Sequence, residues 1–297
     1  MTAGTVATAR PRSGRRLGLF VNRWAILALP AVGFLLVFFL VPLVAMSSRS
    51  VTEPVGAGLD NFARFFGGEG NLRILRNTFW VATIATASTL LIGYPYAYLM
   101  TVVRPRIAGL LLIAVLLPFW SSLLVRTFAW QVILRDTGVI NSFLIDSGIV
   151  TEPLPLAFNT TGVILGMTHV LLPYMVLPLY AVMRRIDPEY GRAAASLGAP
   201  PISAFVRVFL PLSLPGILAG CLLVFVIALG FYITPAMLGS PRESMLSQYI
   251  VQQVQQSLDW GFGSAMAVLL MVITLTILFV ASRLVRLRDV FGSALEE

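Results

Sequence analysis

The sequence has no lysine, and all 21 of its basic residues are arginine. A P-loop ATPase needs a lysine in its phosphate-binding loop, so this chain does not hold such a site. Charge is scarce as well, because Asp, Glu, Lys and Arg make up 11% of the chain, against about 25% in a soluble domain. With 58% hydrophobic residues over 297 positions, the chain is predicted to be an all-α integral membrane protein.

Cysteine and histidine are nearly absent. Cys221 lies in an apolar run and is expected to pack there, since one cysteine makes no disulfide framework. His169 is the only histidine, and no second His, Cys or acidic residue lies at metal-ligand spacing from it. The chain also lacks the HExxH motif, paired aspartates or serine–histidine arrangement of an intramembrane enzyme. We therefore expect a non-catalytic chain that binds no metal or cofactor of its own.

Six apolar runs are present, each long enough to cross a bilayer as a helix. They are Trp24–Met46, Thr78–Val103, Ile107–Leu134, Thr160–Met183, Leu212–Tyr232 and Trp260–Ser282. Residues 23–288 are thus predicted to form one six-helix transmembrane domain. Residues 1–22 are predicted to be a disordered basic tail, and residues 289–297 a second tail. Amphipathic pieces at Leu59–Phe66 and Met245–Leu258 are expected to lie on the membrane surface.

Arginine is distributed unevenly between the two sides that six spans define. Fourteen arginines lie on the side of both termini: Arg10, Arg12, Arg15, Arg16, Arg23, Arg104, Arg106, Arg184, Arg185, Arg192, Arg207, Arg283, Arg286 and Arg288. Six lie on the other side: Arg49, Arg64, Arg73, Arg76, Arg135 and Arg242. Because basic loops stay in the cytoplasm, both termini are predicted to be cytoplasmic. The net charge of +8 is therefore attributed to membrane orientation and not to nucleic-acid binding.

The segment 187–211, called the elbow below, interrupts the apolar pattern. Asp187 is suited to cap a helix, and Glu189–Leu197 is predicted to be a short helix that Gly198 ends. Ala199–Pro201 then forces a turn, because neither of its prolines can continue the preceding helix. A second helix follows, with two phenylalanines one turn apart. We expect a compact helical structure on the cytoplasmic side, shaped for contact with another protein.

The elbow resembles the cytoplasmic coupling loop of ABC importer permeases, whose pattern is E-A-A-x-x-x-G, nine residues, then I-x-L-P. Val208 occupies the isoleucine position. Arg192 stands where the family has its acid, and Glu189, one turn earlier, is expected to replace that acid in part. The resemblance implies contact with a separate ATPase for these residues: Glu189, Arg192, Ala193, Ala194, Leu197, Gly198, Leu210 and Pro211. It also implies that the ATPase, and not this chain, binds ATP and Mg²⁺.

Four further phrases resemble the spermidine/putrescine-type branch of these permeases. In chain order they are LLPFWSSLLVRTFAW (116–130), HVLLPYMVLPLY (169–180), PLSLPGILAG (211–220) and ALGFYITPAMLGSPRE (228–243). The resemblance covers residues 24–288 and implies the type I ABC importer permease fold in a bacterial inner membrane. It implies three partners: an ATPase dimer, a second permease subunit and a periplasmic substrate-binding protein. The expected function is ATP-driven import of a polyamine such as spermidine or putrescine.

One position departs from the polyamine pattern. Many polyamine permeases carry a glutamate in the phrase G-E-F-x-T-P, where this chain has Phe231. None of the six predicted spans contains Asp or Glu, although a polycation benefits from carboxylates along its route. Either a different second permease and the loops supply them, which favours a heterodimer, or the solute is an opine, an amino acid or another small organic compound.

Six residues are candidates for the translocation pathway or its gate: Tyr94, Trp120, Arg126, His169, Phe231 and Tyr232. Arg126 is either an interfacial anchor beside Trp120 and Trp130 or the partner of a loop carboxylate such as Asp136 at an outer gate. Tyr94 is a candidate for cation–π contact with an amine. Gly-x-x-x-Gly pairs at 162/166 and 216/220 predict close helix packing, within the subunit or against the second permease.

An ATP-independent secondary transporter is the remaining alternative. Such proteins usually place ionisable residues at mid-membrane and show repeated halves. The sequence shows neither feature, which favours the ATP-driven class.

Overall fold

The computed structural model describes residues 23–54 and 58–293, with side chains for residues 29–54, 58–241 and 243–283. The tail predicted over residues 1–22 and the last four residues of the second tail lie outside this range. The chain divides into two units, Met1–Met46 and Ser47–Glu297, which are described separately. The described residues contain helices and no strand, as the sequence predicts.

The first unit holds most of α1 (Arg23–Thr52), which covers the first predicted span. Its apolar side chains from Leu29 onward are largely exposed, as expected of a helix that meets lipid or another chain. Pro30 and Pro42 lie inside the helix. A transmembrane helix tolerates them because neighbouring groups satisfy the freed carbonyls.

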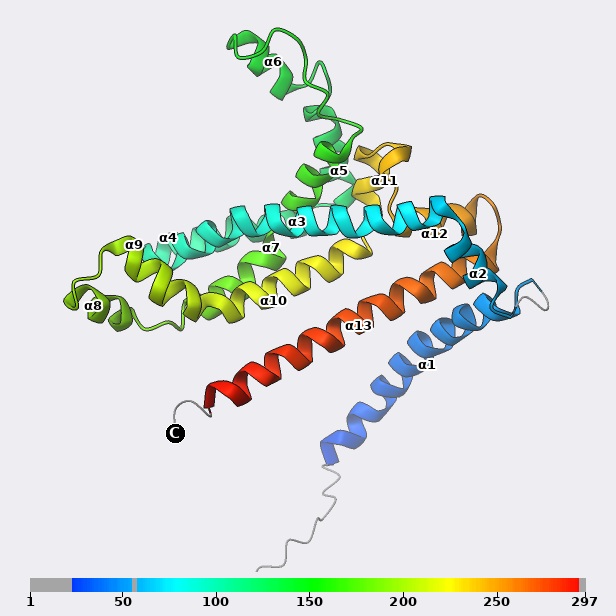
Figure 1. The fold of residues 1–297 in the computed structure, drawn as a ribbon, viewed down its shortest axis with the longest axis horizontal. Coiled ribbons are helices and arrows are strands. Elements are labelled where there is room, and N and C mark those ends of the chain that lie inside the picture. Colours follow the sequence, from blue (N-terminus) through cyan, green and yellow to red (C-terminus); the bar gives the residue numbers. More distant parts are fainter. Residues whose placement is uncertain (1–22, 55–57, 294–297) are drawn as a thin grey trace, which may run out of the picture. The chain divides into compact units, whose positions relative to one another are not determined.

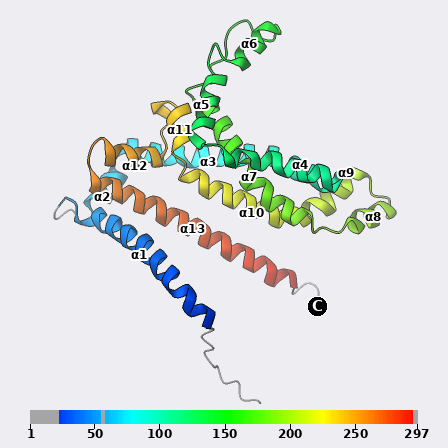
Figure 2. The same cartoon turned by 180° about the vertical axis from the view of Figure 1, so that it is seen from behind.

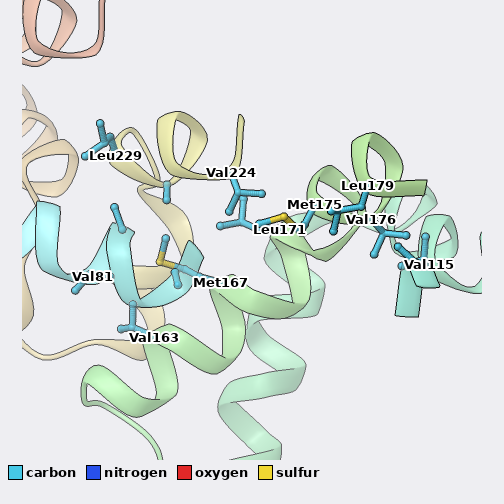
Figure 3. Packing of buried hydrophobic residues seen from close by; sticks show 14 of the residues in the cluster. Val81, Val115, Val163, Met167, Leu171, Met175, Val176, Leu179, Val224 and Leu229 are labelled. Carbon is cyan, nitrogen blue, oxygen red and sulfur yellow. The ribbon is translucent and has the colours of Figure 1, made fainter. Parts of the chain in front are cut away.

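Three long helices form the core of the second unit: α3 (Glu69–Val102), α7 (Thr160–Met183) and α10 (Leu210–Leu229). In Figure 1 they run side by side, and α7 packs against both of the others. Figure 3 shows Leu171 and Met175 of α7 close to Val224 of α10, and all three side chains are fully buried. Because α7 is covered on two sides, it is the most buried of the apolar spans.

Glycines allow these helices to approach closely. A Cβ on Gly216 of α10 would lie 3.0 Å from the Val182 Cβ and 3.3 Å from the Leu179 Cα, both on α7. A Cβ on Gly166 of α7 would meet Leu238 and Thr234 at 2.6 and 2.7 Å. Both Gly-x-x-x-Gly pairs therefore serve packing inside this subunit, which was one of the two predicted alternatives.

Three helices gather at one end of the second unit: α2 (Asp60–Gly67), α12 (Leu246–Gln255) and α13 (Trp260–Ser293). Arg64 of α2 donates to an Asp259 carboxylate oxygen at 2.7 Å, just before α13 begins. The Thr78 hydroxyl of α3 accepts from the Leu246 amide at 2.8 Å, which joins α12 to α3. The predicted amphipathic pieces at 59–66 and 245–258 are confirmed as helices by α2 and α12.

The elbow lies at the opposite end of α3 and α10 (Figure 2). It contains α8 (Pro188–Ser196), α9 (Pro201–Ala204) and η2, a π-helical turn over Phe205–Phe209 that leads directly into α10. By length and composition, the apolar helical stretch that contains α10 runs from Pro201 to Leu229. The elbow's second helix and the span predicted from Leu212 are therefore continuous, whereas the sequence analysis treated them as separate elements.

The third predicted span is not one straight helix. It consists of α4 (Pro105–Leu116), η1 (Leu117–Trp120) and α5 (Leu123–Ile133), with a bend of 100° between the two parts. The break follows from Pro118, which has no N–H to donate, and from the extended backbone of Ser121 and Ser122. A further helix, α6 (Val139–Asp146), continues beyond α5.

The fifth predicted span, Leu212–Tyr232, ends three residues early as a helix. α10 ends at Leu229, and after Gly230, Phe231 and Tyr232 the chain forms α11 (Ile233–Leu238) and then η3 (Pro241–Glu243). α11 packs against α5 and α7. The chain thus brings α11, which follows the interruption at Gly230–Tyr232, against α5, which follows the bend in the third predicted span. The stretches α4–η1–α5 and α10–α11, each interrupted by non-helical residues, are called the broken spans below.

Among the described residues, four helices are long and apolar enough to cross a membrane, or five if the bent α4–α5 pair counts as one span. Six spans were predicted, and the one that these criteria leave out is α3. Its 34 residues include charged residues in the first turns and several threonines and tyrosines beyond them.

We predict that Gly216→Leu destabilises the fold. The added side chain enters the α7–α10 contact, where overpacking costs about 1–3 kcal/mol. Thermal unfolding in detergent, followed by loss of the monodisperse elution peak, measures the effect. Gly70→Leu is the matched control, because a Cβ there meets nothing within 4 Å. Equal unfolding temperatures for the two variants would contradict the packing role of Gly216.

Candidate functional site

Helix α8 of the elbow begins after Asp187 and ends before Gly198, the two residues that the sequence predicts to limit it. The Asp187 carboxylate accepts a hydrogen bond from the Glu189 amide at 2.9 Å and so caps α8. Gly198 has φ of +82°, a conformation that side chains with a Cβ rarely adopt, and it ends the helix. The Ala199 amide then donates to the Ala194 carbonyl at 3.0 Å. These bonds fix the direction in which α8 leaves the turn.

Little of the surface of α8 is covered by the rest of the chain. None of its residues is buried, and Leu197, which follows it, is 90% exposed. Ile202 of α9 is 79% exposed, and Tyr190 of α8 is also exposed. A short helix bordered by exposed apolar side chains is typical of a contact surface for a partner. Ile202 and Tyr190 were not among the predicted contact residues, although each is a large apolar residue in an otherwise polar and small-residue segment.

The charged pair of the elbow is weak. The Arg192 guanidinium lies 3.9 Å from a Glu189 carboxylate oxygen, and both side chains are about three-quarters exposed. Such surface pairs contribute little to stability. Glu189 is therefore near the position that the family's acid would hold, and it stays available to a partner. Ala193 is exposed, whereas Ala194 and Leu210 are partly covered.

The elbow is connected to α3 by an aromatic joint, made of Tyr94, Tyr98, Phe205 and Phe209. The rings of Phe205 and Phe209 stack with centroids 5.7 Å apart. Tyr98 meets both edge-on, at 5.3 and 5.1 Å, and Tyr94 meets Phe205 at 6.2 Å. The π-helical turn lies within this joint, and such turns are frequent at functional sites.

Tyr94 is further held by Ser213 of α10, with 2.9 Å between the two hydroxyl oxygens. The structure therefore places this predicted pathway residue in the aromatic joint and not at the broken spans. Tyr96 donates instead to the Leu111 carbonyl of α4 at 2.6 Å.

The second candidate region is where the broken spans meet. The Trp130 indole N–H of α5 donates to His169 Nδ1 of α7 at 3.1 Å. The hydroxyls of Thr127 on α5 and Thr234 on α11 lie 3.2 Å apart, and the Gln131 amide donates to the Met237 carbonyl at 3.3 Å. Three polar contacts thus tie α5 to its neighbours. The sequence analysis did not select Thr127, Gln131 or Thr234 as site residues, since isolated polar residues in apolar runs form no recognisable motif.

Arg126 lies on α5, one turn before Trp130. Of the two alternatives for Arg126, the ion pair with a loop carboxylate such as Asp136 is not formed in this structure, because Arg126 makes no ion pair with any described residue. Its Nε atom is buried without a hydrogen-bond partner. The 100° bend explains the difference, since a straight helix was assumed in placing Arg126 beside the loop. Trp120, at the bend itself, is 79% exposed.

Phe231 and Tyr232 lie in the interruption between α10 and α11. The Phe231 carbonyl, which a regular helix would satisfy, accepts from the Ser247 hydroxyl at 2.7 Å. Tyr232 is 40% exposed. Of the six predicted pathway residues, Trp120, Arg126, His169, Phe231 and Tyr232 thus lie on or beside the two broken spans. Within the part of the chain that the structure describes, no cluster of His, Cys, Asp or Glu is suited to hold a metal.

Comparison with known proteins identifies the fold that carries these two regions. Residues 1–289 match the family described as "Binding-protein-dependent transport system inner membrane component". The chain belongs to this family. It is therefore the permease subunit of a binding-protein-dependent ABC importer.

Curated relatives agree with this family. The permease is 38% identical to the spermidine/putrescine transport system permease protein PotB of Haemophilus influenzae, over 71% of this chain and 74% of that one. It is 32% identical to PotB of Escherichia coli, over 86% and 95% of the two chains. The molybdenum transport system permease protein ModB of Mycobacterium bovis is 31% identical over 88% and 94%.

Solved structures show the same fold at lower identity. The permease matches a chain of a bacterial ABC transporter involved in the import of the acidic polysaccharide alginate, with a TM-score of 0.68 and 21% identity. That match covers 89% of this chain and 95% of the other. The all-helical ABC permease fold predicted from the sequence is thereby confirmed.

We predict that Gly198→Val abolishes uptake while the protein still accumulates in the membrane. A β-branched residue at positive φ is strongly disfavoured, so the turn after α8 would open and α8 would change direction. Solute uptake by cells and the amount of protein in isolated membranes measure the two effects. Gly198→Asn is the matched control, because asparagine tolerates this conformation and should keep most of the activity. Full uptake by the valine variant would show that the turn does not matter.

Proposed function

We propose that this permease crosses the membrane six times and forms a translocation pathway together with a second permease subunit. The proposed solute is a polyamine such as spermidine or putrescine. The observation that supports it most directly is the elbow, a capped and exposed helix joined firmly to two spans. The PotB relatives support the solute class, since they are named for spermidine and putrescine transport and match most of this chain. In this proposal α3 supplies the sixth span.

The elbow is proposed to be the cytoplasmic coupling helix that an ATPase grips. The excess of arginine on the side of the elbow supports this orientation, and it places both termini in the cytoplasm. ATP and Mg²⁺ are held by the ATPase. When the two ATPases close, α8 moves, and the aromatic joint passes the motion to α3 while η2 passes it to α10.

The broken spans are proposed to form the gate. Non-helical backbone at membrane depth is tolerated only where it is buried in protein or lines a cavity. Two interruptions occur here, one at Ser121–Ser122 and one at Gly230–Tyr232, and the helices that follow them, α5 and α11, pack together. Trp120 is exposed at the first. Motion of α10 would separate α11 from α5 and so open the route for a solute released by the binding protein outside.

A different second permease is favoured over a second copy of this chain. A pore formed by two copies would contain Arg126 twice and no acidic residue from any predicted span. Such a pore repels polyamines, so acidic residues of a partner are expected to supply the attraction.

A solute that carries a carboxylate, such as an amino acid or an opine, is the second candidate. Arg126 favours it, because its buried Nε has no partner and the residue lies beside the broken spans. A carboxylate would satisfy that group by a charge-assisted hydrogen bond.

Uptake of labelled solutes by cells with and without this chain tests the proposal. We expect spermidine uptake that requires the chain, that unlabelled putrescine reduces, and that ATP depletion stops. Inhibition by amino acids or opines, with no effect of putrescine, would support the second candidate. Uptake that survives ATP depletion but collapses with the proton gradient would contradict the ATP-driven class.

We predict that Leu197→Asp uncouples transport from ATP hydrolysis. The exposed Leu197 side chain is expected to enter an apolar part of the ATPase groove, and a carboxylate there would remain unpaired. Uptake should fall at least tenfold, while the purified complex loses the stimulation of ATPase activity by loaded binding protein. Leu197→Met keeps an apolar side chain of similar volume and should behave like the wild type. Coupled ATPase activity in the aspartate variant would exclude Leu197 from the contact.

A further inference from the structure

A cavity of about 830 Å³ lies behind the elbow, between α8–η2 on one side and the adjoining ends of α3, α4 and α7 on the other. This volume falls within the range of small-molecule sites in proteins, about 300–1,000 Å³. The coupling contacts proposed above use the exposed surface of the elbow and leave the cavity unexplained.

The lining of the cavity changes from polar to apolar along its length. Arg184, Asp187 and Tyr190 line the part near α8. Ala108 and Leu112 of α4 line the other part, together with apolar residues of η2. Leu112 is seven residues into α4 from Pro105, or about 10 Å at the rise of an α-helix. The cavity is therefore amphipathic, and with the elbow in the cytoplasm its α4 side would extend from the membrane surface into the apolar layer.

The cavity also borders a surface suited to lipid chains. Ile107, Leu110 and Ile113 of α4 are exposed and recur every third residue, so they share one face of the helix. Gly109, between them, lines the cavity, and a Cβ at this position meets nothing within 4 Å. An acyl chain lying on this apolar face would thus find an open path into the cavity.

The polar part carries a surplus of positive charge. Arg184 lines this part, and four further exposed arginines are sequence neighbours of lining residues. None of the five forms an ion pair with a described residue: Arg104, Arg106, Arg184, Arg185 and Arg207. The acids nearby are Asp187, whose carboxylate caps α8, and Glu189, which pairs with Arg192. The unpaired guanidinium groups therefore favour an anionic ligand such as a phosphate group.

We propose that this cavity binds one anionic phospholipid of the inner leaflet, with its phosphate at Arg184 and an acyl chain along Ala108, Gly109 and Leu112. The proposal rests on the cytoplasmic placement of the elbow. A lipid held here fills the space between α4 and the aromatic joint, because Tyr98, Phe205 and Phe209 line the same cavity. It would support the elbow from behind while the ATPase contacts α8 from outside.

The lipid that remains bound to the purified protein tests the proposal. The permease, with the subunits that co-purify, is incubated in mild detergent with equal amounts of phosphatidylglycerol and phosphatidylcholine. Bound lipid is then counted by native mass spectrometry. We expect one phosphatidylglycerol per permease, at least fivefold over phosphatidylcholine, and no displacement by 10 mM inorganic phosphate, which lacks an acyl chain.

Two variants locate the lipid. Arg184→Gln should lower retained phosphatidylglycerol at least threefold, and Gly109→Phe should exclude both lipids by filling the cavity. Arg73→Gln, an exposed arginine at the other end of α3, is the matched control and should retain the lipid. Unfolding temperatures identify any variant that fails to fold, and Arg184→Gln alone remains a sufficient test because its side chain is exposed.

Three results would overturn the proposal: equal retention of the two lipids, unchanged retention in Arg184→Gln, or a partner polypeptide occupying the cavity in a structure of the assembled importer. Lipid retention requires neither ATP nor solute. A failure of the lipid site therefore leaves the transport proposal intact, and a failure of polyamine uptake leaves the lipid measurement valid.

Discussion

The structure of this permease depends on how backbone groups are satisfied where helices stop inside an apolar layer. Each interruption exposes N–H and C=O groups that water does not reach at that depth. Side chains of neighbouring helices supply part of the missing hydrogen bonds. The Phe231 carbonyl accepts from Ser247, and the Met237 carbonyl accepts from Gln131, which belongs to the other broken span. Side chains of α12 and α5 thus hold the segment from Phe231 to Met237 in place.

The same dependence connects the two candidate regions. α10 begins at the elbow and ends at Gly230, so one helix carries the π-helical turn at its start and the second interruption at its end. α7 packs along it through Gly216 and also carries His169, the acceptor of the Trp130 hydrogen bond. In the proposed coupling, a displacement at the elbow would therefore reach the broken spans through two close-packed helices and not through flexible loops.

The sequence predicted the elements whose ends carry a local chemical signal. Asp187 and Gly198 marked the limits of α8, because a cap and a positive φ depend on single residues. The bend after Trp120 was missed, since Pro118 within an apolar run is equally compatible with a mild kink. The prediction for Arg126 assumed a straight helix for the same reason. The aromatic joint was missed in part, because the contact of Tyr98 with Phe205 joins residues more than 100 positions apart.

The exposure of α8 has a consequence for how this permease and its ATPase diverge. None of its residues contributes to the interior, and a single glycine sets its direction. Substitutions on its outer surface therefore leave the transmembrane fold unaffected. An arginine at position 192 in place of an acid is such a change, and in the proposed coupling it would require only a compensating charge on the ATPase. On that proposal, the choice of ATPase partner can change at the membrane surface while the pore remains as it was.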